Sequence, residues 1–454
     1  MKAAGAGALG MALAAGRESG ADAKEAVQSV ASPVATGEYV GGLTAPKLET
    51  VRVGFIGVGA RGGSHVEQIL GLEGTEITAI CDSYEPAALQ WQTVCQDAGQ
   101  RNVRVYTNGD HDYRNMLERE NIDIVLISTP WRWHAIQAVD TMLSGKHAFV
   151  EVPIATTVDD CWLLVDTAER TQKHCMMMEN VCYGRDELMA LNMCRKGIFG
   201  DLTHGEAAYI HDLRSQMLHI DRGTGSWRTN HHVYRNGNLY PTHGLGPIAQ
   251  YMNINRTDDA FSHLVSLSSP AVGRQEFATN LFPANHIRNR VDDYCGDINT
   301  SIIKTVQGRT ILVQHDTTTP RPYSRLNLIQ GTKGALAGFP TRIYQEGMSQ
   351  WHYWAEGYDL DRFYAQFDHP LWKRLEAQAR QAGGHGGMDF VMLWRIIECL
   401  RNGEPLDQNV YEGCSWSVVS PLSEESVRHD GAPVAFPDFT RGKWRETAPL
   451  GIVS

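Results

Sequence analysis

Three glycines and one aspartate have the types and spacing of a dinucleotide site. Gly57, Gly59 and Gly62 form a G-x-G-x-x-G motif directly after the apolar run 51–56. The first glycine allows a tight turn, the second lets backbone N–H groups approach a pyrophosphate, and the third lets the next helix pack closely on its strand. A second apolar run ends in Asp82, where a carboxylate can accept the ribose hydroxyls. The pattern predicts NAD rather than NADP; the alternative is a glycine-rich turn that binds nothing.

A later stretch, rich in aromatic and polar residues, could transfer protons. It comprises 227–232 and 238–247, which we expect to be loops, and it contains Tyr240 and His243 three positions apart. If a helix begins at His243, both side chains can point into one cavity, where a Tyr hydrogen-bonded to a His can act as an acid or a base. The alternative is a buried histidine that caps a helix beside a packed tyrosine.

Further candidates follow the predicted strands of the first half. The strand 122–127 stops at Ser-Thr-Pro, so the segment from Trp131 to His134 falls where ligands lie in a doubly wound sheet. This segment either contacts the cofactor or forms an aromatic lid over a helix start. Asn180 and Tyr183 follow the last strand of this half, and their polar groups are expected to face the same crevice.

Strand and helix patterns alternate from residue 51 to about 180, as a parallel sheet with crossover helices requires. This indicates an α/β fold that begins with a Rossmann dinucleotide-binding domain. The predicted strands are 51–56, 77–81, 103–106, 122–127, 148–150 and 173–180, and the predicted helices are 85–98, 113–120, 135–144 and 159–171.

From about residue 188 the pattern changes to that of a second domain. A helix to residue 196 precedes a strand at 204–210, and 301–306 with 310–315 form a hairpin. The glycine-rich run 383–387 precedes an amphipathic helix at 390–401, which we expect to return against the sheet or the first domain.

The chain divides into three predicted parts. Residues 1–47 are an export signal or a flexible leader, 48–186 are the NAD-binding domain, and 187–454 are a substrate-binding domain. The small-residue apolar run 3–15 indicates export to the periplasm or the medium rather than a cytoplasmic location. No later run has the roughly 20 apolar residues that a membrane span requires.

Composition excludes one class of partner. The 41 basic and 52 acidic residues leave a net charge of −11, which repels a polyanion, and no basic run with interleaved aromatics is present. Nucleic acid is therefore not an expected partner. The nine cysteines form no C-x-x-C pair and read as small buried residues.

The first half resembles the Gfo/Idh/MocA oxidoreductases. The dinucleotide motif, Ser-Thr-Pro after a strand, Gly-Lys-His at 145–147 and Glu-x-Pro at 151–153 occur in that order. The resemblance implies a Rossmann domain followed by an α+β domain with an open, mostly antiparallel sheet. In that family Glu-Lys-Pro supplies a catalytic lysine, but this chain has Val152 there, and an apolar side chain cannot move a proton.

Four segments together resemble glycoside hydrolase family 109. They are Glu-Val-Pro at 151–153, Met-Glu-Asn-Val-Cys-Tyr-Gly-Arg at 178–185, Trp-Arg at 227–228 and Tyr-Pro-Thr-His-Gly-Leu-Gly-Pro at 240–247, and the likeness runs from about residue 50 to near the C-terminus. The resemblance implies a retaining α-N-acetylgalactosaminidase that holds NAD as a non-consumed cofactor. It implies NAD contacts from Arg61, Gly62, Asp82, Trp131 to His134, Glu151, Val152 and Asn180, and sugar contacts from Tyr209, Arg228, Tyr240, His243 and Tyr323.

The chemistry implied by this resemblance is a transient oxidation. Hydride removal from sugar C3 gives a ketone that acidifies the C2 proton, the C1 substituent leaves by elimination, water adds, and the hydride returns. We assign the C3 hydroxyl proton to His243 with Tyr240, and the C2 proton or the leaving oxygen to Tyr183 or a neighbouring group. The stretch 227–247 offers no obvious pair of carboxylates of the kind that classical glycosidases use.

The sequence also predicts the remaining partners and leaves two rival functions open. No metal is expected, because His231 and His232 are adjacent and would point to opposite sides of an extended chain. The rivals are a conventional NAD-dependent sugar or polyol dehydrogenase on the same fold and a non-catalytic sugar-binding protein. A glycan or glycoside is the expected substrate, and the open sheet is expected to pair in a homodimer.

Overall fold

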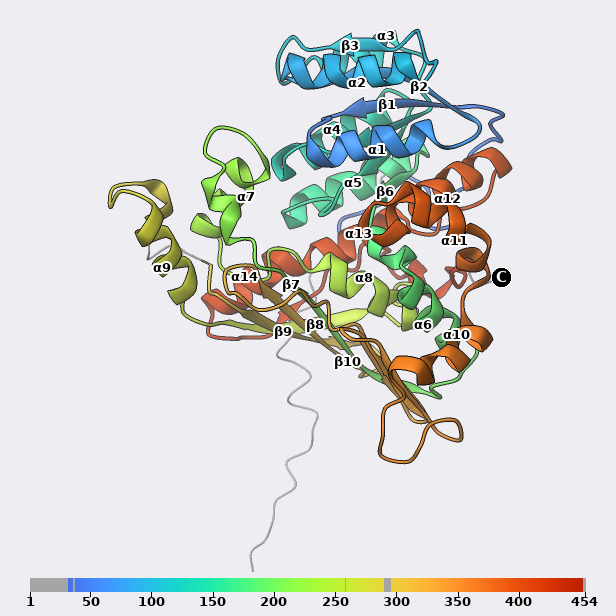
Figure 1. Cartoon of the computed structure of the whole chain (residues 1–454), viewed down its shortest axis with the longest axis vertical. Helices are drawn as coiled ribbons and strands as arrows, with labels where there is room; N and C mark the ends of the chain where they lie inside the picture. Colours follow the sequence, from blue (N-terminus) through green and yellow to red (C-terminus); the bar gives the residue numbers. More distant parts are fainter. Residues whose placement is uncertain (1–31, 36, 258, 290–294, 452–454) are drawn as a thin grey trace, which may run out of the picture.

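The computed structural model describes residues 32–35, 37–257, 259–289 and 295–451. The apolar run 3–15, on which the predicted export signal rests, lies outside the described residues. Figure 1 shows the first domain at the top and a second, larger sheet below it, with helices between the two. None of the helices in the described ranges is both long and apolar enough to cross a bilayer.

The first domain is built on six parallel strands in the order β3-β2-β1-β4-β5-β6. The central strands are buried on both faces, as their continuous apolar sequences predict. The strand order reverses between β1 and β4, which is the position where dinucleotides bind in such sheets. The strands are β1 (Val51–Ile56), β2 (Thr75–Cys81), β3 (Arg104–Tyr106), β4 (Ile124–Ile127), β5 (His147–Val150) and β6 (Cys175–Met177).

The crossover helices agree with the sequence pattern except at one start. Helix α4 begins at Trp131 and not at residue 135, so the Trp131 to His134 segment is the first helical turn. The turn is fixed because the two ring nitrogens of His134 lie 2.7 Å from the carbonyl oxygens of Thr129 and Pro153. The helices are α1 (Ala60–Leu70), α2 (Glu85–Asp97), α3 (Tyr113–Arg119), α4 (Trp131–Leu143) and α5 (Val158–Thr171).

The second domain is an eight-stranded, mostly antiparallel open sheet, as predicted, in the order β13-β12-β11-β7-β10-β9-β8-β14. Only the β7–β10 pair is parallel among the strand pairs of this sheet in the described residues. Leu267 and Ile302 are exposed on strands β8 and β9; pairing of two subunits through the open sheet stays a prediction. The strands are β7 (Leu202–Ile210), β8 (Phe261–Ser268), β9 (Asn299–Thr305), β10 (Thr310–Asp316), β11 (Leu328–Gly331), β12 (Gly334–Ala337), β13 (Arg342–Gln345) and β14 (Val434–Ala435).

The connection between β7 and β8 is largely helical, and the prediction of a loop at 227–232 was wrong. Helix α7 (Thr224–Tyr234) contains that segment, and helix α8 (Thr242–Tyr251) starts one residue before His243. The aromatic and histidine side chains gain a rigid support in this way, and α8 packs on β7. The remaining helices of this half before the last strands are α6 (Arg185–Arg195) and α9 (Val272–Leu281).

The C-terminal helices return to the first domain. Helix α12 (Met388–Asn402), which contains the predicted helix 390–401, packs on α1 and β1 and on the 3-10 turn η2 (Asn180–Tyr183). Helix α13 (Val410–Ser417) packs on α5 and β6, and α14 (Val419–Arg428) covers β8. In Figure 1 these red helices lie between the two sheets. The other two are α10 (Asp361–Phe367) and α11 (Pro370–Ala382).

A buried ion pair fixes this return. The Arg256 guanidinium donates two hydrogen bonds, at 2.7 and 2.9 Å, to the Glu412 carboxylate, and the two side chains are 8% and 2% exposed. Glu412 also accepts the backbone N–H of Asn409 and closes the capping box of α13. The loop after α8 is thereby tied to the helix that covers β6.

Removing the negative charge of Glu412 should lower the stability of the whole fold. We expect Glu412→Gln to lower the free energy of unfolding by about 3 kcal/mol, because the buried Arg256 loses its counter-charge. Denaturant unfolding measures the difference. Glu425→Gln is the control, since Glu425 is exposed and pairs with Arg428 at the surface, and should cost less than about 1 kcal/mol. Equal losses in the two variants would contradict the prediction.

Candidate active site

The dinucleotide loop has the backbone that its glycines predict. Gly57 has a φ of 83°, and a Cβ on Gly62 would lie 1.9 Å from the carbonyl oxygen of Gly57. A Cβ on Gly59, by contrast, would meet nothing within 4 Å. The loop therefore packs closely on α1 at Gly62 and leaves open space in front of Gly59, where a pyrophosphate would lie. Asp82 braces the loop by accepting the Val58 N–H at 2.9 Å.

Two polar atoms without partners mark the strand ends beside this loop. Ser128 Oγ follows β4 and Asn180 Oδ1 follows β6, and both are shielded from solvent without a hydrogen-bond partner in the described ranges. Buried polar atoms are normally satisfied in folded proteins. Together with the open loop, these atoms fit a bound dinucleotide, with the pyrophosphate at Gly59 and hydrogen bonds available at Ser128 and Asn180.

Glu151 lies at the end of β5 under two basic side chains. Its Oε1 accepts hydrogen bonds from Arg61 Nε at 2.7 Å and pairs with His65 Nε2 at 2.6 Å. Burial alone would raise the pKa of Glu151, but the charge of Arg61 and the contact with His65 outweigh it and lower the pKa to about 2. Glu151 is thus held ionised, and the neighbouring Val152 is buried.

A second carboxylate, which the sequence analysis did not single out, joins the elements of the cofactor site. Asp389, at the start of α12, is completely buried and binds the Arg61 guanidinium at 2.6 and 3.0 Å and the Asn180 amide at 2.5 Å. His385 Nδ1 lies 2.7 Å from the same carboxylate. The only sequence signal was the glycine run that precedes α12.

The residues predicted to bind sugar lie together. The ring centroid of Tyr209 is 4.6 Å from that of Tyr240, 5.4 Å from that of His243 and 6.4 Å from that of Tyr323. Trp131 stacks on Tyr240 at 5.7 Å and so belongs to this aromatic cluster. The cluster joins the first turn of α4 to β7 and α8. It comprises Trp131, Tyr209, His211, Trp227, His231, Tyr240, His243 and Tyr323.

Arg228 is a buried cation inside the aromatic cluster. Its guanidinium carbon lies 4.2 Å from the ring centroid of Tyr240 and 5.1 Å from that of Trp131. Nε and Nη2 are buried and lack hydrogen-bond partners within the part of the chain that the structure describes. Two unused donors between aromatic rings suit the oxygen atoms of a sugar or its N-acetyl group.

His243 is backed by a buried carboxylate. Its Nδ1 lies 2.7 Å from Oε1 of Glu179, whose side chain is completely buried. The ring of Tyr240 is 4.9 Å away from that of His243, and burial raises the pKa of Tyr240 well above its usual value. The arrangement provides an oriented imidazole beside a tyrosine that stays protonated, which is suited to proton transfer.

Tyr183 lies away from the aromatic cluster, whereas His134 lies beside the 151–153 segment. The Tyr183 side chain is fully buried and its hydroxyl donates to Asp407 at 3.2 Å, beside Arg395, so it does not reach the aromatic cluster. The assignment of Tyr183 to proton transfer is therefore corrected: it follows the expected strand, but the η2 turn directs it toward α12. His134 is also buried, and its ring bonds hold the start of α4.

The two adjacent histidines contact different neighbours. His231 packs on Trp131 at 4.9 Å between ring centroids, whereas His232 stacks on His315 at 5.6 Å. They diverge because they are neighbours on helix α7, not on an extended segment as expected. No group of three or more His, Cys, Asp or Glu side chains in the described ranges could hold a metal ion.

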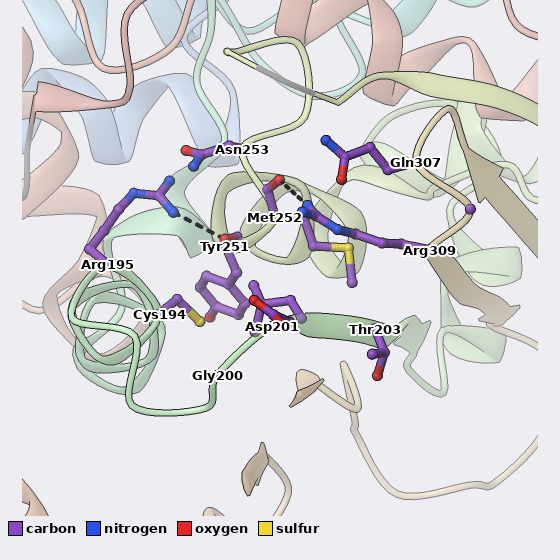
Figure 2. A pocket seen from close by; sticks show the side chains of 12 residues that line it. Cys194, Arg195, Gly200, Asp201, Thr203, Tyr251, Met252, Asn253, Gln307 and Arg309 are labelled. Atoms are coloured by element: carbon purple, nitrogen blue, oxygen red, sulfur yellow. Dashed lines mark hydrogen bonds between the residues drawn. The ribbon is translucent and has the colours of Figure 1, made fainter. Parts of the chain in front are cut away.

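A separate hollow of about 510 Å³ lies at the other end of β7 and α8. Figure 2 shows Arg195 and Arg309 along it, with hydrogen bonds to the carbonyl oxygens of Tyr251 and Met252. Cations at the last carbonyls of a helix stabilise it. These arginines therefore stabilise the C-terminal end of α8. The candidate site is the aromatic cluster at the start of that helix.

Comparison with known sequences places the chain in a family. The model described as "Oxidoreductase family, NAD-binding Rossmann fold" matches residues 51–179, and "Glycosyl hydrolase 109, C-terminal domain" matches residues 183–446. Two proteins named as glycosyl hydrolase family 109 members, from Shewanella sp. (strain W3-18-1) and Shewanella baltica (strain OS155), are 62% and 61% identical, over 94% of this chain and 93% of each relative. The chain belongs to glycosyl hydrolase family 109.

Solved structures show the same fold in dehydrogenases. Levoglucosan dehydrogenase in complex with NADH and levoglucosan is 18% identical, with a TM-score of 0.62 over 86% of this chain and 100% of that one. The WlbA dehydrogenase from Bordetella pertussis, in complex with NADH and UDP-GlcNAcA, is 16% identical, with a TM-score of 0.59 over 87% and 99%. The predicted family and fold class are confirmed: this is a family 109 glycosyl hydrolase with an NAD-binding Rossmann domain.

A methyl group at Gly59 should test the cofactor loop. Because a Cβ there meets no protein atom, Gly59→Ala should fold normally yet collide with the pyrophosphate, so we expect at least a tenfold loss of NAD affinity. Calorimetric titration measures binding, and thermal unfolding checks the fold. Gly42→Ala is the control, because a Cβ on Gly42 also meets nothing within 4 Å. Unchanged NAD affinity in Gly59→Ala would refute this placement.

The pH dependence of stability should show the contribution of the ionised Glu151 carboxylate. Its pKa of about 2 lies below the ordinary value of 4.5, so its ionised form stabilises the fold above pH 4.5, and this contribution is lost as the pH falls toward 2. Glu151→Gln lacks the contribution, and its free energy of unfolding should fall less steeply over that range. Denaturant unfolding at several pH values measures both slopes, with the exposed Glu446→Gln as control. A slope in Glu151→Gln equal to that of the unaltered protein would exclude the assignment.

Proposed function

We propose that this protein is a retaining α-N-acetylgalactosaminidase that uses NAD without consuming it. Family membership and the NAD-binding domain support a hydrolase with a dinucleotide. The observation that carries the proposal is the pair formed by His243 and the buried Glu179. It stands within the aromatic cluster, which the first turn of α4 joins to the NAD-binding domain.

The carboxylates near Tyr240 are poorly suited to the classical two-carboxylate mechanism. Glu179 pairs with His243, whose ring lies beside that of Tyr240, and Glu151 pairs with Arg61 after β5. A glycosidase acid must carry a proton near neutral pH. Glu151 cannot, because its pKa is about 2, and Glu179 is completely buried beneath His243.

The side chains of the site can instead support a transient oxidation. NAD held at Gly59, Ser128 and Asn180 would supply a reversible hydride acceptor for sugar C3, and oxidation there would permit elimination at C1 and addition of water. His243 Nε2 accepts the C3 hydroxyl proton, and Glu179 stabilises the resulting positive ring. The Tyr240 hydroxyl donates a hydrogen bond to the sugar, and the unused Nε and Nη2 donors of Arg228 bind its N-acetyl oxygen.

The rival function is a conventional sugar or polyol dehydrogenase. The similar solved structures are dehydrogenases, but identities of 16% and 18% establish the fold alone. Val152 disfavours this rival, because the apolar side chain stands where such enzymes carry the lysine that exchanges the hydroxyl proton.

Removal of the nucleotide separates these functions. We expect the purified protein to cleave a nitrophenyl α-N-acetylgalactosaminide without added NAD and without net formation of NADH. Protein stripped of nucleotide should lose cleavage and recover it when NAD is returned. Release of nitrophenol by the stripped protein would refute the proposal, and net NADH from free sugar without glycoside cleavage would establish the dehydrogenase.

A matched pair of variants tests the role of His243 in the same assay. His243→Gln should lower kcat by about 100- to 10,000-fold, because an oriented acid–base group is lost. His263→Gln changes a histidine of β8 that is bonded only to its neighbour Ser262, and should leave kcat unchanged. Equal activity of both variants would remove His243 from the mechanism.

A further inference from the structure

The glycine run before α12 presents a histidine in an unusual backbone. Gly383, Gly384, His385, Gly386 and Gly387 have φ values of 70°, 68°, 48°, 74° and 97°. Positive φ at five successive residues is a backbone that glycine adopts most readily. The one non-glycine residue among them is the histidine.

The imidazole is held by the carboxylate that joins the cofactor elements. His385 Nδ1 lies 2.7 Å from Asp389 Oδ2, which is completely buried and also binds Arg61. The Asp389 Oδ1 atom binds the Asn180 amide. Burial alone would raise the pKa of Asp389, but His385 and Arg61 outweigh it and lower the pKa. An ionised Asp389 fixes the proton of His385 on Nδ1 and leaves Nε2 as an acceptor.

The His385 imidazole stands exposed beside the cofactor elements, since its Nδ1 also lies 3.4 Å from Arg61 Nη1. Its side chain is 62% exposed, and Nε2 has no hydrogen-bond partner in the described ranges. The segment touches α1, since a Cβ on Gly384 would lie 2.3 Å from the Gln68 amide. On the other side, the Asp389 carboxylate that holds His385 binds the Asn180 amide, and the preceding residue, Glu179, pairs with His243 of the aromatic cluster. His385 is therefore close to both halves of the site.

The proposed function, on which this inference rests, requires two proton acceptors. One removes the proton of the C3 hydroxyl and the other removes the proton of C2. His243 supplies the first, Val152 cannot supply the second, and Tyr183 is directed away from the site. We propose that His385, oriented by Asp389, is the proton-transfer residue that acts at C2 of the sugar.

The step balances with groups already named. In the C3 ketone form of the sugar, Nε2 of neutral His385 takes the proton from C2. The electron pair of the C2–H bond becomes the C1–C2 double bond, and the C1–O pair leaves on the aglycone oxygen, which takes a proton from water. The hydroxide left by that water then bonds to C1, and the His385 ring returns the proton to C2. The imidazole is neutral again before the hydride returns to C3.

Replacement of His385 should separate the two proton transfers. We expect His385→Gln to bind NAD like the unaltered protein but to cleave the aryl glycoside about 100- to 10,000-fold more slowly. Reduced nicotinamide should then accumulate on mixing with substrate, because oxidation at C3 still occurs and elimination stalls. In deuterated water, unreacted substrate should incorporate less deuterium at C2 than it does with the unaltered protein. Activity equal to the unaltered protein, loss of bound NAD, or slow cleavage without reduced nicotinamide would each overturn the proposal.

A second variant keeps the test independent of packing. His385→Gly fits the positive φ of this position, and added imidazole should restore its cleavage at least tenfold. His429→Gln is the matched control, since His429 is 59% exposed and lies 2.9 Å from Glu425, a surface pair of the same type. Its activity and deuterium exchange should be unchanged. Failure of imidazole to rescue His385→Gly would count against a proton-transfer role.

The unaltered protein distinguishes failure of this inference from failure of the proposed function. If it cleaves the glycoside only with NAD present and exchanges the C2 proton, the proposed function holds, and the His385 variants alone decide the inference. If it shows neither, the proposed function is refuted, and the inference about His385, which depends on it, is refuted as well.

Discussion

The architecture of the site depends on one buried carboxylate. Asp389 has no access to solvent, and a charge in that position must be paired to be tolerated. Its partners are Arg61 on the helix that follows the dinucleotide loop and Asn180 at the end of β6. A residue from the last quarter of the chain thereby joins two strand ends of the first domain, and the return of α12 becomes a condition for a complete cofactor site.

The same arrangement recurs around the crevice. Glu151 lies under Arg61 and His65, Glu179 under His243, and Asp389 under His385 and Arg61. In each case a largely buried carboxylate pairs with a basic side chain, and Arg61, His243 and His385 are more exposed than the carboxylates that hold them. A buried acid that stays ionised makes a poor glycosidase acid but a good partner for an imidazole. The electrostatics of the site therefore favour proton movement by histidine and tyrosine.

The fold of this protein does not by itself determine its chemistry. The two sheets are those of NADH-binding dehydrogenases, and their similarity extends over more than four fifths of the chain. At 18% and 16% identity these structures share the fold alone. At the junction of its two domains this chain carries an apolar Val152, a cationic Arg228 between aromatic rings, and a His243 backed by Glu179. The function of a shared scaffold is set by such sites and not by the strand order.

Local pattern was enough to determine the Rossmann domain and its loop. Gly57, Gly59 and Gly62 act through backbone geometry over a few residues. The alternation of apolar strands with helices can be recognised directly in the sequence. The sequence also indicated that Tyr240 and His243 belong together, because they share one helix start. It misjudged the 227–232 segment as a loop, since a run of Trp, Arg, Asn and His has little helical preference of its own and α7 gains its stability from packing.

Only the tertiary structure decided which distant side chains meet. Tyr183 follows the expected strand, yet the turn of η2 directs its hydroxyl to Asp407. Asp389 and His385 lie more than 300 residues from Arg61 along the chain, and no local pattern connects them. Sequence spacing reports neighbours along one strand or helix. Pairing of buried charges between elements depends on where whole helices pack, and that is set by the complete fold.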